Sequence, residues 1–133
     1  MTHAADHRQP ATTNLDIAER LFSAIERGDL DTVRELYAPG CEIWHNNDQQ
    51  VQTVEQNMRT LIWVTTNVKG FRYEDVKRQA TETGFIEQHM TCGTGPSGVE
   101  FRFPACIVVT IVDGKISRLD EYFDSAHLAP LVG

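Results

Sequence analysis

One carboxylate near the end of the chain is well placed for acid–base chemistry. Side chains alternate between the two faces of a strand, so in the stretch 115–123 Leu119, Glu121 and Phe123 share one face. Burying a carboxylate between two large apolar side chains is costly unless it has a partner or a chemical task. We therefore expect Glu121 to act as a general base or acid in an apolar pocket whose wall includes Leu119 and Phe123. The alternative is a structural carboxylate tied to Arg102 or to a backbone N–H group.

The stretch 41–46 offers three further candidates on a short strand. Trp44 and Asn46 share one face, and His45 lies on the other. The amide of Asn46 could hold a water or a substrate carbonyl, or it could cap the turn that follows. Trp44 is expected to form pocket wall or core, with its indole ring towards the substrate. Because His45 has the opposite parity, His45 and Trp44 cannot both face the pocket without a bulge.

His89 is another candidate for proton transfer, in the predicted strand 84–92. Glu87 shares its face, whereas Ile86, Met90 and Cys92 occupy the other face. If the apolar face is the core, His89 and Glu87 point outward or towards a partner subunit. If the pocket takes the polar face, His89 becomes a proton shuttle.

Metal and nucleotide sites are not indicated by the residue spacing. Three suitable ligands do not converge on one predicted position, and no glycine-rich loop opens a helix, so we expect no metal and no cofactor. Cys41, Cys92 and Cys106 are far apart and are interpreted as buried free thiols.

Composition limits the classes of protein and partner. A chain of 133 residues fits one domain with a core and a modest pocket. A net charge of −7 and scattered basic residues argue against nucleic acid as a partner. No apolar run approaches the ~18 residues of a membrane span, and the N-terminus has no signal-peptide pattern, so we expect a cytoplasmic protein without a membrane partner.

Three helices are predicted in the first half of the chain. Apolar residues recur at helical spacing after Asn14, which is a fair N-cap, and again after Asp29. Thr53 and the glutamine three residues later form a capping box before a third helix. Phe22 and Met58, on the apolar sides of the first and third helices, are expected to contact the substrate.

Four strands are predicted in the second half, over residues 71–79, 84–92, 99–112 and 115–123. Asp113–Gly114 is a two-residue hairpin turn, and Pro104 predicts a bulge or bend in the third of these strands. This order predicts an α+β domain over residues 14–124, with three helices packed on a strongly curved, mainly antiparallel sheet that encloses a pocket. Residues 1–13 and 125–133 are interpreted as tails.

Two segments resemble a known superfamily. Leu36–Gly40 (LYAPG) followed by Glu42–His45 (EIWH) is similar to the opening of the SnoaL-like branch of the nuclear-transport-factor-2-like superfamily. Asp113–Ile116 (DGKI) followed by Glu121–Asp124 (EYFD) looks like its last strand. The resemblance implies a cystatin-like cone and commonly a homodimer. The fold hosts cyclases, isomerases, dehydratases, epoxide hydrolases and binding modules.

Relatives with this fold suggest roles for individual residues. Limonene-epoxide hydrolase carries a Tyr-x-Asn motif on its first strand, matched here by Trp44 and Asn46, and a carboxylate matched by Glu121. The arginine of its middle strand has no counterpart within residues 87–92. Polyketide cyclases and ketosteroid isomerases use one pocket carboxylate as a base. Scytalone dehydratase places histidines on the sheet, which Glu121 with His89 or His45 resembles.

These observations predict a cofactor-independent enzyme that acts by acid–base chemistry on a small apolar organic molecule. Isomerase, cyclase, dehydratase and epoxide-hydrolase reactions all fit. The alternative is a non-catalytic module for small-ligand binding or dimerisation. We also expect a homodimer formed through the exposed face of the sheet.

Overall fold

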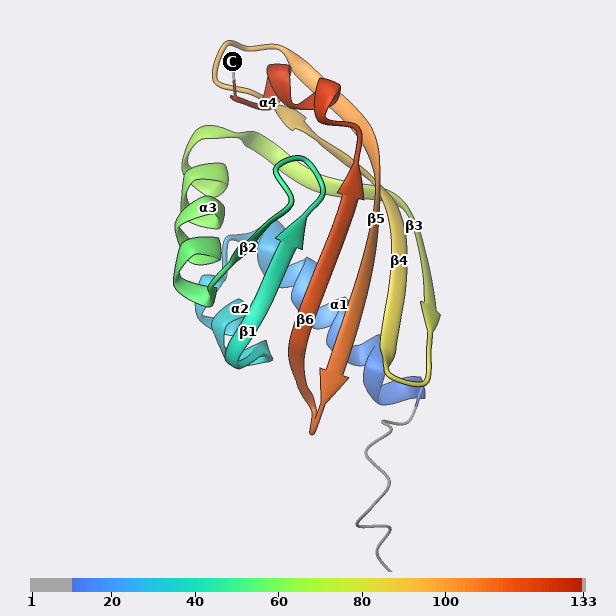
Figure 1. The fold of residues 1–133 in the computed structure, drawn as a ribbon. Helices are drawn as coiled ribbons and strands as arrows, with labels where there is room; N and C mark the ends of the chain where they lie inside the picture. The colour runs from blue at the N-terminus through green and yellow to red at the C-terminus, as the bar shows by residue number, and fades with distance from the viewer. Residues whose placement is uncertain (1–10, 133) are drawn as a thin grey trace, which may run out of the picture.

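The computed structural model describes residues 11–132, which form three main helices packed against a six-stranded sheet (Figure 1). This confirms the α+β class predicted from the order of the elements. The predicted tail 1–13 lies outside the described residues except for its last three, which belong to the first helix.

The helices are α1 (Ala11–Arg27), α2 (Leu30–Leu36) and α3 (Val54–Asn67). Gly28 ends α1 with a φ of 71°, in the left-handed region that glycine adopts without a steric penalty. Asp29 caps α2, and its Oδ1 accepts a hydrogen bond from the Thr32 backbone N at 3.2 Å. Thr53 and Gln56 form the predicted capping box at the start of α3.

The first helix begins earlier than the sequence predicted. Asn14, the expected N-cap, lies inside α1 and is fully buried. Its side-chain Nδ2 donates to the backbone oxygen of Thr81 at 3.4 Å, which joins α1 to the turn over residues 81–83. A tertiary partner, invisible in the local sequence, therefore outweighs the capping preference of asparagine.

The strands are β1 (Tyr37–His45), β2 (Gln50–Gln52), β3 (Lys69–Ala80), β4 (Gly84–Thr94), β5 (Glu100–Val112) and β6 (Lys115–Phe123). Their spatial order is β2-β1-β6-β5-β4-β3, so the sheet is open, and only the β1–β6 pair is parallel. In Figure 1, α1 runs across the sheet and α3 lies beside β1 and β2. This order places the first strand directly against the last one.

The hairpin between β5 and β6 forms as predicted. Asp113 and Gly114 have φ values of 52° and 76°, the positive pair that a tight antiparallel turn requires. The predicted bulge at Pro104 is wrong, because β4 and β5 pair in one continuous register through Met90 and Pro104. Pairing of β5 with β6 begins only at Ala105, so the proline lies where one side of β5 has no strand partner.

The C-terminal segment 125–133 is not a structureless tail. It continues from β6 into a 3₁₀ helix, Ser125–Leu128, and a short helix α4, Ala129–Val132. Asp124 caps the first of these, with its Oδ1 accepting from the backbone N of Ala126 at 3.0 Å. This segment packs over β4 and β5 at the upper end of the sheet (Figure 1).

Two groups of buried side chains hold the layers together. The larger lies between α1, α2 and the sheet and includes the fully buried Leu21, Ile43 and Phe85. The smaller contains Val64, Val68, Phe101 and Phe103, where the end of α3 meets β5. The inner side of the sheet is thus covered at both ends, and the space between the two groups is available for a site.

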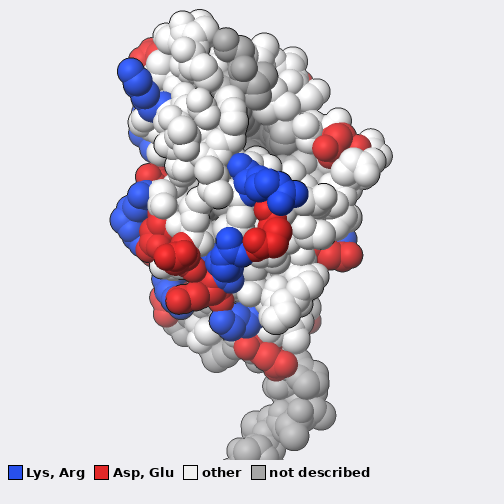
Figure 2. All heavy atoms as spheres, turned by 90° about the vertical axis from the view of Figure 1, so that its left-hand side faces the viewer, with Lys and Arg blue, Asp and Glu red and all other residues white. Residues whose placement is uncertain are grey.

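On the surface shown in Figure 2, Lys and Arg side chains lie beside Asp and Glu side chains and do not gather into one basic patch. Within the described residues, no helix combines the length and apolar character needed to cross a membrane.

Candidate functional site

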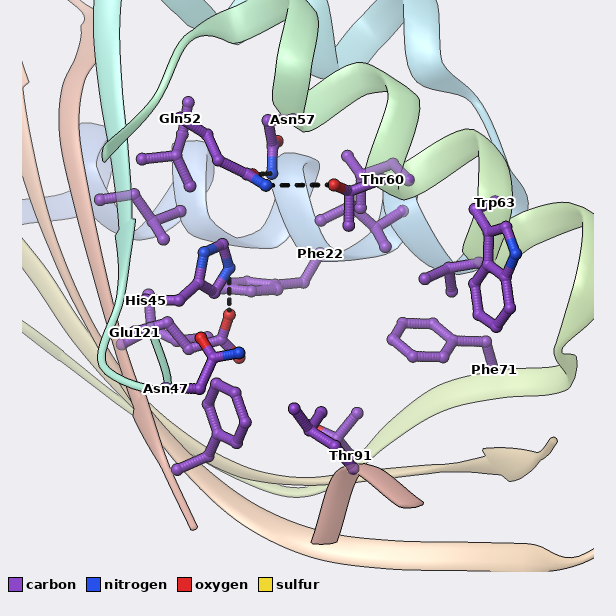
Figure 3. Close-up of a pocket in the computed structure, with 18 of the residues that line it drawn as sticks. Phe22, His45, Asn47, Gln52, Asn57, Thr60, Trp63, Phe71, Thr91 and Glu121 are labelled. Carbon is purple, nitrogen blue, oxygen red and sulfur yellow. Dashed lines mark hydrogen bonds and ion pairs between the residues drawn. The ribbon is translucent and has the colours of Figure 1, made fainter. Parts of the chain in front are cut away.

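A cavity of about 600 Å³ lies between the inner face of the sheet and helices α1 and α3 (Figure 3). Its wall is largely aromatic and aliphatic. Seven aromatic residues contribute, namely Phe22, Tyr37, Trp63, Phe71, Tyr73, Phe103 and Phe123. The lining residues that can carry a charge near neutral pH are His45, Asp48 and Glu121, and none of the lining residues is Lys or Arg. A ligand in this space would meet both apolar side chains and several uncharged polar groups.

The central polar feature of the cavity is a hydrogen-bonded pair, His45 and Glu121. Nε2 of His45 lies 3.1 Å from Oε1 of Glu121, and the two side chains are 21% and 23% exposed. The parallel register of β1 and β6 sets these residues directly beside each other on the same face. Within residues 11–132 no other group hydrogen-bonds to the second oxygen of Glu121, Oε2.

The protonation of His45 is governed by opposing effects. Burial is the largest and lowers its pKa, but the hydrogen bond to Glu121 and the negative charges of Glu121 and Asp48 together outweigh burial, so the pKa is raised above its ordinary value. The pair therefore favours an imidazolium beside a carboxylate. Such a pair offers a proton donor and a proton acceptor at one place.

A chain of four polar side chains lies opposite this pair, on β1, β2 and α3. The Tyr37 hydroxyl donates to Oδ1 of Asn57 at 2.9 Å, and Nδ2 of Asn57 donates to Oε1 of Gln52 at 3.2 Å. Gln52 in turn donates to the Thr60 hydroxyl at 3.2 Å. Figure 3 shows Gln52, Asn57 and Thr60 of this chain across the cavity from His45. Each amide N has a second hydrogen available for a ligand oxygen.

Sequence reasoning missed this polar chain. Its one visible sign is Asn57, three residues after Val54 and next to Met58, which places an amide on the apolar side of α3. Gln52 gave no sign, because no strand was predicted between the strand over residues 41–46 and the third helix.

Trp44 and Asn46 do not line the cavity, contrary to the prediction. Both lie on the opposite face of β1, where the Trp44 ring packs 5.3 Å from that of Tyr122. Oδ1 of Asn46 accepts from the backbone N of Phe123 at 3.0 Å, and the Asn46 backbone N donates to the Glu121 backbone oxygen at 3.0 Å. The physical reason is parity: Ile43 packs inward in the core, so His45 faces the cavity and its neighbours do not.

His89 also lies away from the accessible part of the cavity. It is 3% exposed and packs against the rings of Phe22 and Tyr73, at centroid distances of 5.3 and 4.3 Å. Its Nδ1 lies 2.6 Å from Oε2 of Glu87, and Oε1 of Glu87 pairs with Arg78. The polar face of β4 thus turns towards α1, but aromatic rings separate it from the lining of the cavity.

The apolar residues predicted to contact substrate are divided by the structure. Leu119, Phe123 and Phe22 line the cavity. Met58 is 2% exposed and belongs to the core between α3 and the sheet, so it is not a lining residue.

Within residues 11–132, no group of three or more His, Cys, Asp or Glu side chains is arranged to hold a metal ion. Cys41 and Cys92 are buried free thiols and Cys106 is half-buried. Burial, with the nearby charge of Glu42, raises the pKa of Cys41 to about 12, which makes it a poor nucleophile.

Comparison of the sequence with models of protein families identifies the family to which this chain belongs. The model of the SnoaL-like domain matches residues 18–119, well over half of the chain. The chain belongs to the SnoaL-like domain family. The predicted resemblance is therefore confirmed.

Solved structures with the same fold come from several bacteria. A provisionally named polyketide cyclase of Xanthomonas campestris pv. campestris superposes with a TM-score of 0.81 at 15% identity, covering 92% of this chain and 98% of that one. An LEH-like epoxide hydrolase of M. tuberculosis gives 0.76 at 18% identity, covering 88% and 86%.

A third such structure is a ketosteroid isomerase-like protein from Catenulispora acidiphila, in complex with trimethylamine. It gives a TM-score of 0.75 at 14% identity, covering 86% of this chain and 91% of that one. At these identities the similarity shows the fold alone. None of the proteins of curated function matches this chain.

Proposed function

We propose that this SnoaL-like protein is an enzyme that transfers a proton on a small, largely apolar carbonyl compound, with Glu121 as the base. The observation that carries the proposal is the His45–Glu121 pair, a carboxylate and an imidazole 3.1 Å apart in a wall of aromatic and aliphatic side chains. A charged pair with no further partner on Glu121 Oε2 contributes little to holding the layers together, but it suits proton transfer.

The reaction follows from the two oxygens of Glu121. Oε1 is held by His45, which fixes the direction of the carboxylate. Oε2 removes a hydrogen as a proton from the carbon next to the carbonyl group, and the bonding electrons move onto the carbonyl oxygen to give an enolate. Return of the proton to another carbon completes an isomerisation, and attack of the enolate carbon on a second carbonyl closes a ring. Neither path needs an oxidant or a cofactor.

The cavity also limits the substrate. About 600 Å³ accepts a molecule of two or three rings, and pockets of this size usually bury most of such a ligand. The polar chain of Tyr37, Asn57 and Gln52 supplies amide hydrogens for an oxygen of the ligand. A lining with two carboxylates and without Lys or Arg disfavours anionic molecules.

The test is exchange of the α-hydrogens of 4-phenylcyclohexanone in D₂O, followed by NMR. Wild-type protein should accelerate the exchange, and Glu121→Gln, which keeps the shape and removes the base, should lower the rate by about 10²–10⁴-fold. Thermal unfolding of the two proteins should be similar. A wild-type rate equal to that of buffer, or an equal rate for Glu121→Gln, would contradict the proposal.

The second candidate function is binding of an organic cation without catalysis. Seven aromatic rings and two carboxylates line the cavity, and aromatic faces attract alkylammonium groups. The C. acidiphila protein of the same fold was solved with trimethylamine. Calorimetric titration with trimethylamine tests this candidate: heat of binding to wild-type protein that persists in Glu121→Gln, together with no exchange of the ketone, would favour it over the enzyme.

A further inference from the structure

Three polar side chains on the inner wall of β3 and β4 have atoms without a hydrogen-bond partner among the described residues. Thr91 and His89 are 4% and 3% exposed, and Oγ1 of Thr91 and Nε2 of His89 are buried without a partner. The hydroxyl of Tyr73, which lines the cavity, makes no hydrogen bond within residues 11–132. Buried polar atoms are nearly always paired, so an unpaired group of this kind requires an explanation.

The three side chains form one cluster. Tyr73 and Thr91 are direct cross-strand partners in the antiparallel β3–β4 pair, so their side chains are neighbours on one face. The ring of His89 lies 4.3 Å from that of Tyr73. Tyr73 and Thr91 both line the cavity, and the label of Thr91 in Figure 3 marks this wall, across the cavity from Gln52 and Asn57.

The surroundings of the cluster set which of its groups can meet a ligand. Arg78 pairs with Glu87, and Nδ1 of His89 lies 2.6 Å from Oε2 of Glu87, so His89 is tied to the buried network behind the wall of the cavity. Burial, reinforced by the charges of Glu121 and Glu87, raises the pKa of Tyr73, so its hydroxyl keeps its hydrogen and can donate. The wall thus offers two hydroxyl groups, those of Tyr73 and Thr91, which have no partner among residues 11–132.

The position of Tyr73 is held by packing rather than by polar contacts. Its ring lies 5.2 Å from Phe22 and 5.4 Å from Phe71, both in edge-on geometry, and its backbone N donates to Oε2 of Glu26 on α1 at 2.9 Å. A hydroxyl held in this way is pre-organised for a ligand, because little side-chain freedom remains to be lost on binding.

The cluster is separated from Glu121 by the width of a ligand. Glu121 pairs with Ile107, which pairs with Glu87, and Thr91 lies four residues further along β4. This is about 10 Å across the strands and roughly 13 Å along them, measured between backbones. Glu121 and Thr91 both line the cavity, so a ligand that spans it can contact the two side chains at its two ends.

We propose that Tyr73 and Thr91 form a second polar subsite, which binds a hydroxyl group of the substrate remote from the carbon at which Glu121 acts. A hydroxyl both accepts and donates, so it can accept from the Tyr73 hydroxyl and donate to Oγ1 of Thr91, which both line the cavity. The substrate class is therefore a carbonyl compound of two or three rings with a hydroxyl group at its far end. This inference rests on the proposed function for the identity of the reacting end.

The experiment compares two ketones that differ in one hydroxyl group, 4-(4-hydroxyphenyl)cyclohexanone and 4-phenylcyclohexanone. Their dissociation constants are measured calorimetrically for wild-type protein, and the hydroxylated ketone should bind about 3–10-fold more tightly, as expected for one neutral hydrogen bond. Tyr73→Phe and Thr91→Val should each reduce this ratio towards one. Thr91→Ser, which restores a hydroxyl at the same position, should keep it.

Circular dichroism and thermal unfolding establish that each variant is folded before its ratio is used. Equal affinity of wild-type protein for the two ketones, including no measurable binding of either, would overturn the subsite. A preference that survives in both Tyr73→Phe and Thr91→Val would also overturn it. Ketone exchange by wild-type protein separates the two proposals: equal affinity for the two ketones together with accelerated exchange refutes the subsite alone, whereas a preference for the hydroxylated ketone without accelerated exchange refutes the proposed function alone.

Discussion

The inner face of the sheet carries two glutamate–histidine pairs with different surroundings. His45 and Glu121 lie at the surface of the cavity, each about one-fifth exposed, and have each other as their partner. His89 and Glu87 have fully buried side chains, and Glu87 is also bound by Arg78, which continues to Glu19 on α1. The residue types are the same, but the number of partners and the access to a ligand differ.

This difference in partners and access distinguishes a pair that can react with a ligand from a pair that stabilises the fold. A carboxylate with both oxygens engaged by Arg78 and His89 cannot accept a proton from a substrate without breaking its network. A carboxylate in the wall of an apolar cavity, with one oxygen that has no partner among the described residues, can accept such a proton. We therefore assign proton transfer to Glu121, and we assign to Glu87 the role of holding β3, β4 and α1 together while orienting His89.

The largest expected effect on stability is that of Glu87→Gln. The change leaves the Arg78 charge with Glu19 alone, and breaking a buried pair by removing one partner is strongly destabilising. We expect a loss of about 2–3 kcal/mol in the free energy of unfolding, measured by urea denaturation. Glu19→Gln, at the exposed end of the same network, is the matched control and should change it by less than about 1 kcal/mol. Equal effects of the two changes would show that burial does not distinguish the two ends.

A smaller effect, dependent on pH, is expected for His45→Gln. The pKa of His45 is raised in the folded protein, so the pair stabilises the fold fully below the unfolded value of about 6.5 and loses this contribution as the pH rises through the folded-state pKa. The stability difference between wild type and His45→Gln should therefore shrink from about pH 6 to about pH 9. Urea denaturation at both pH values measures it, and a difference that grows with pH would contradict the pair as described.

Asn46→Ala should lower stability by about 1 kcal/mol, because the backbone N of Phe123 loses its acceptor at the end of β6. The effect on ketone exchange should be much smaller than that of Glu121→Gln, because Asn46 does not line the cavity. Chemical denaturation and the exchange assay measure both quantities. A loss of exchange as large as that of Glu121→Gln would return Asn46 to the site, as the sequence suggested.

Changes on the outer face of the sheet should affect ketone exchange least, and they should instead affect the association of two chains. Trp44 and Tyr122 pack together there, and Tyr122 is 46% exposed, with half-buried Val108 and Met90 on neighbouring strands. We propose that a second copy of the chain covers this face, as predicted from the sequence. Light scattering should give the mass of a dimer for wild type and of a monomer for Tyr122→Lys, and a wild-type monomer would contradict the proposal.

Strand parity was the part of the site that the sequence could predict. Alternation holds over the second half of β6, beyond the irregularity next to Ile116, so Leu119, Glu121 and Phe123 were placed on one face before any partner strand was known. Parity alone could not say which face of β1 is inward. The inward face of β1 is set by its parallel register with β6, in which Ile43 pairs with Leu119. Because the sequence does not show this register, Trp44 was preferred over His45 as a residue of the pocket wall.

Long-range partners were the part that the sequence could not predict. Arg78 reaches Glu87 only because the β3–β4 register shifts between Glu74 and Lys77, where Asp75 adopts a φ of 53°. Nothing in the local pattern of residues 71–79 indicates that irregularity. The fold was predictable because it depends on hydrophobic periodicity and turn residues. The different roles of the His45–Glu121 and His89–Glu87 pairs depend on strand register, which the local sequence does not show.

The most direct test of this account is the exchange rate of 4-phenylcyclohexanone measured on Glu121→Gln and Glu87→Gln side by side, per mole of folded protein. We predict that Glu121→Gln loses exchange by about 10²–10⁴-fold with a loss of stability no larger than that of His45→Gln, whereas Glu87→Gln loses more stability and keeps a rate close to that of wild type. The reverse result, with exchange lost in Glu87→Gln and retained in Glu121→Gln, would contradict it.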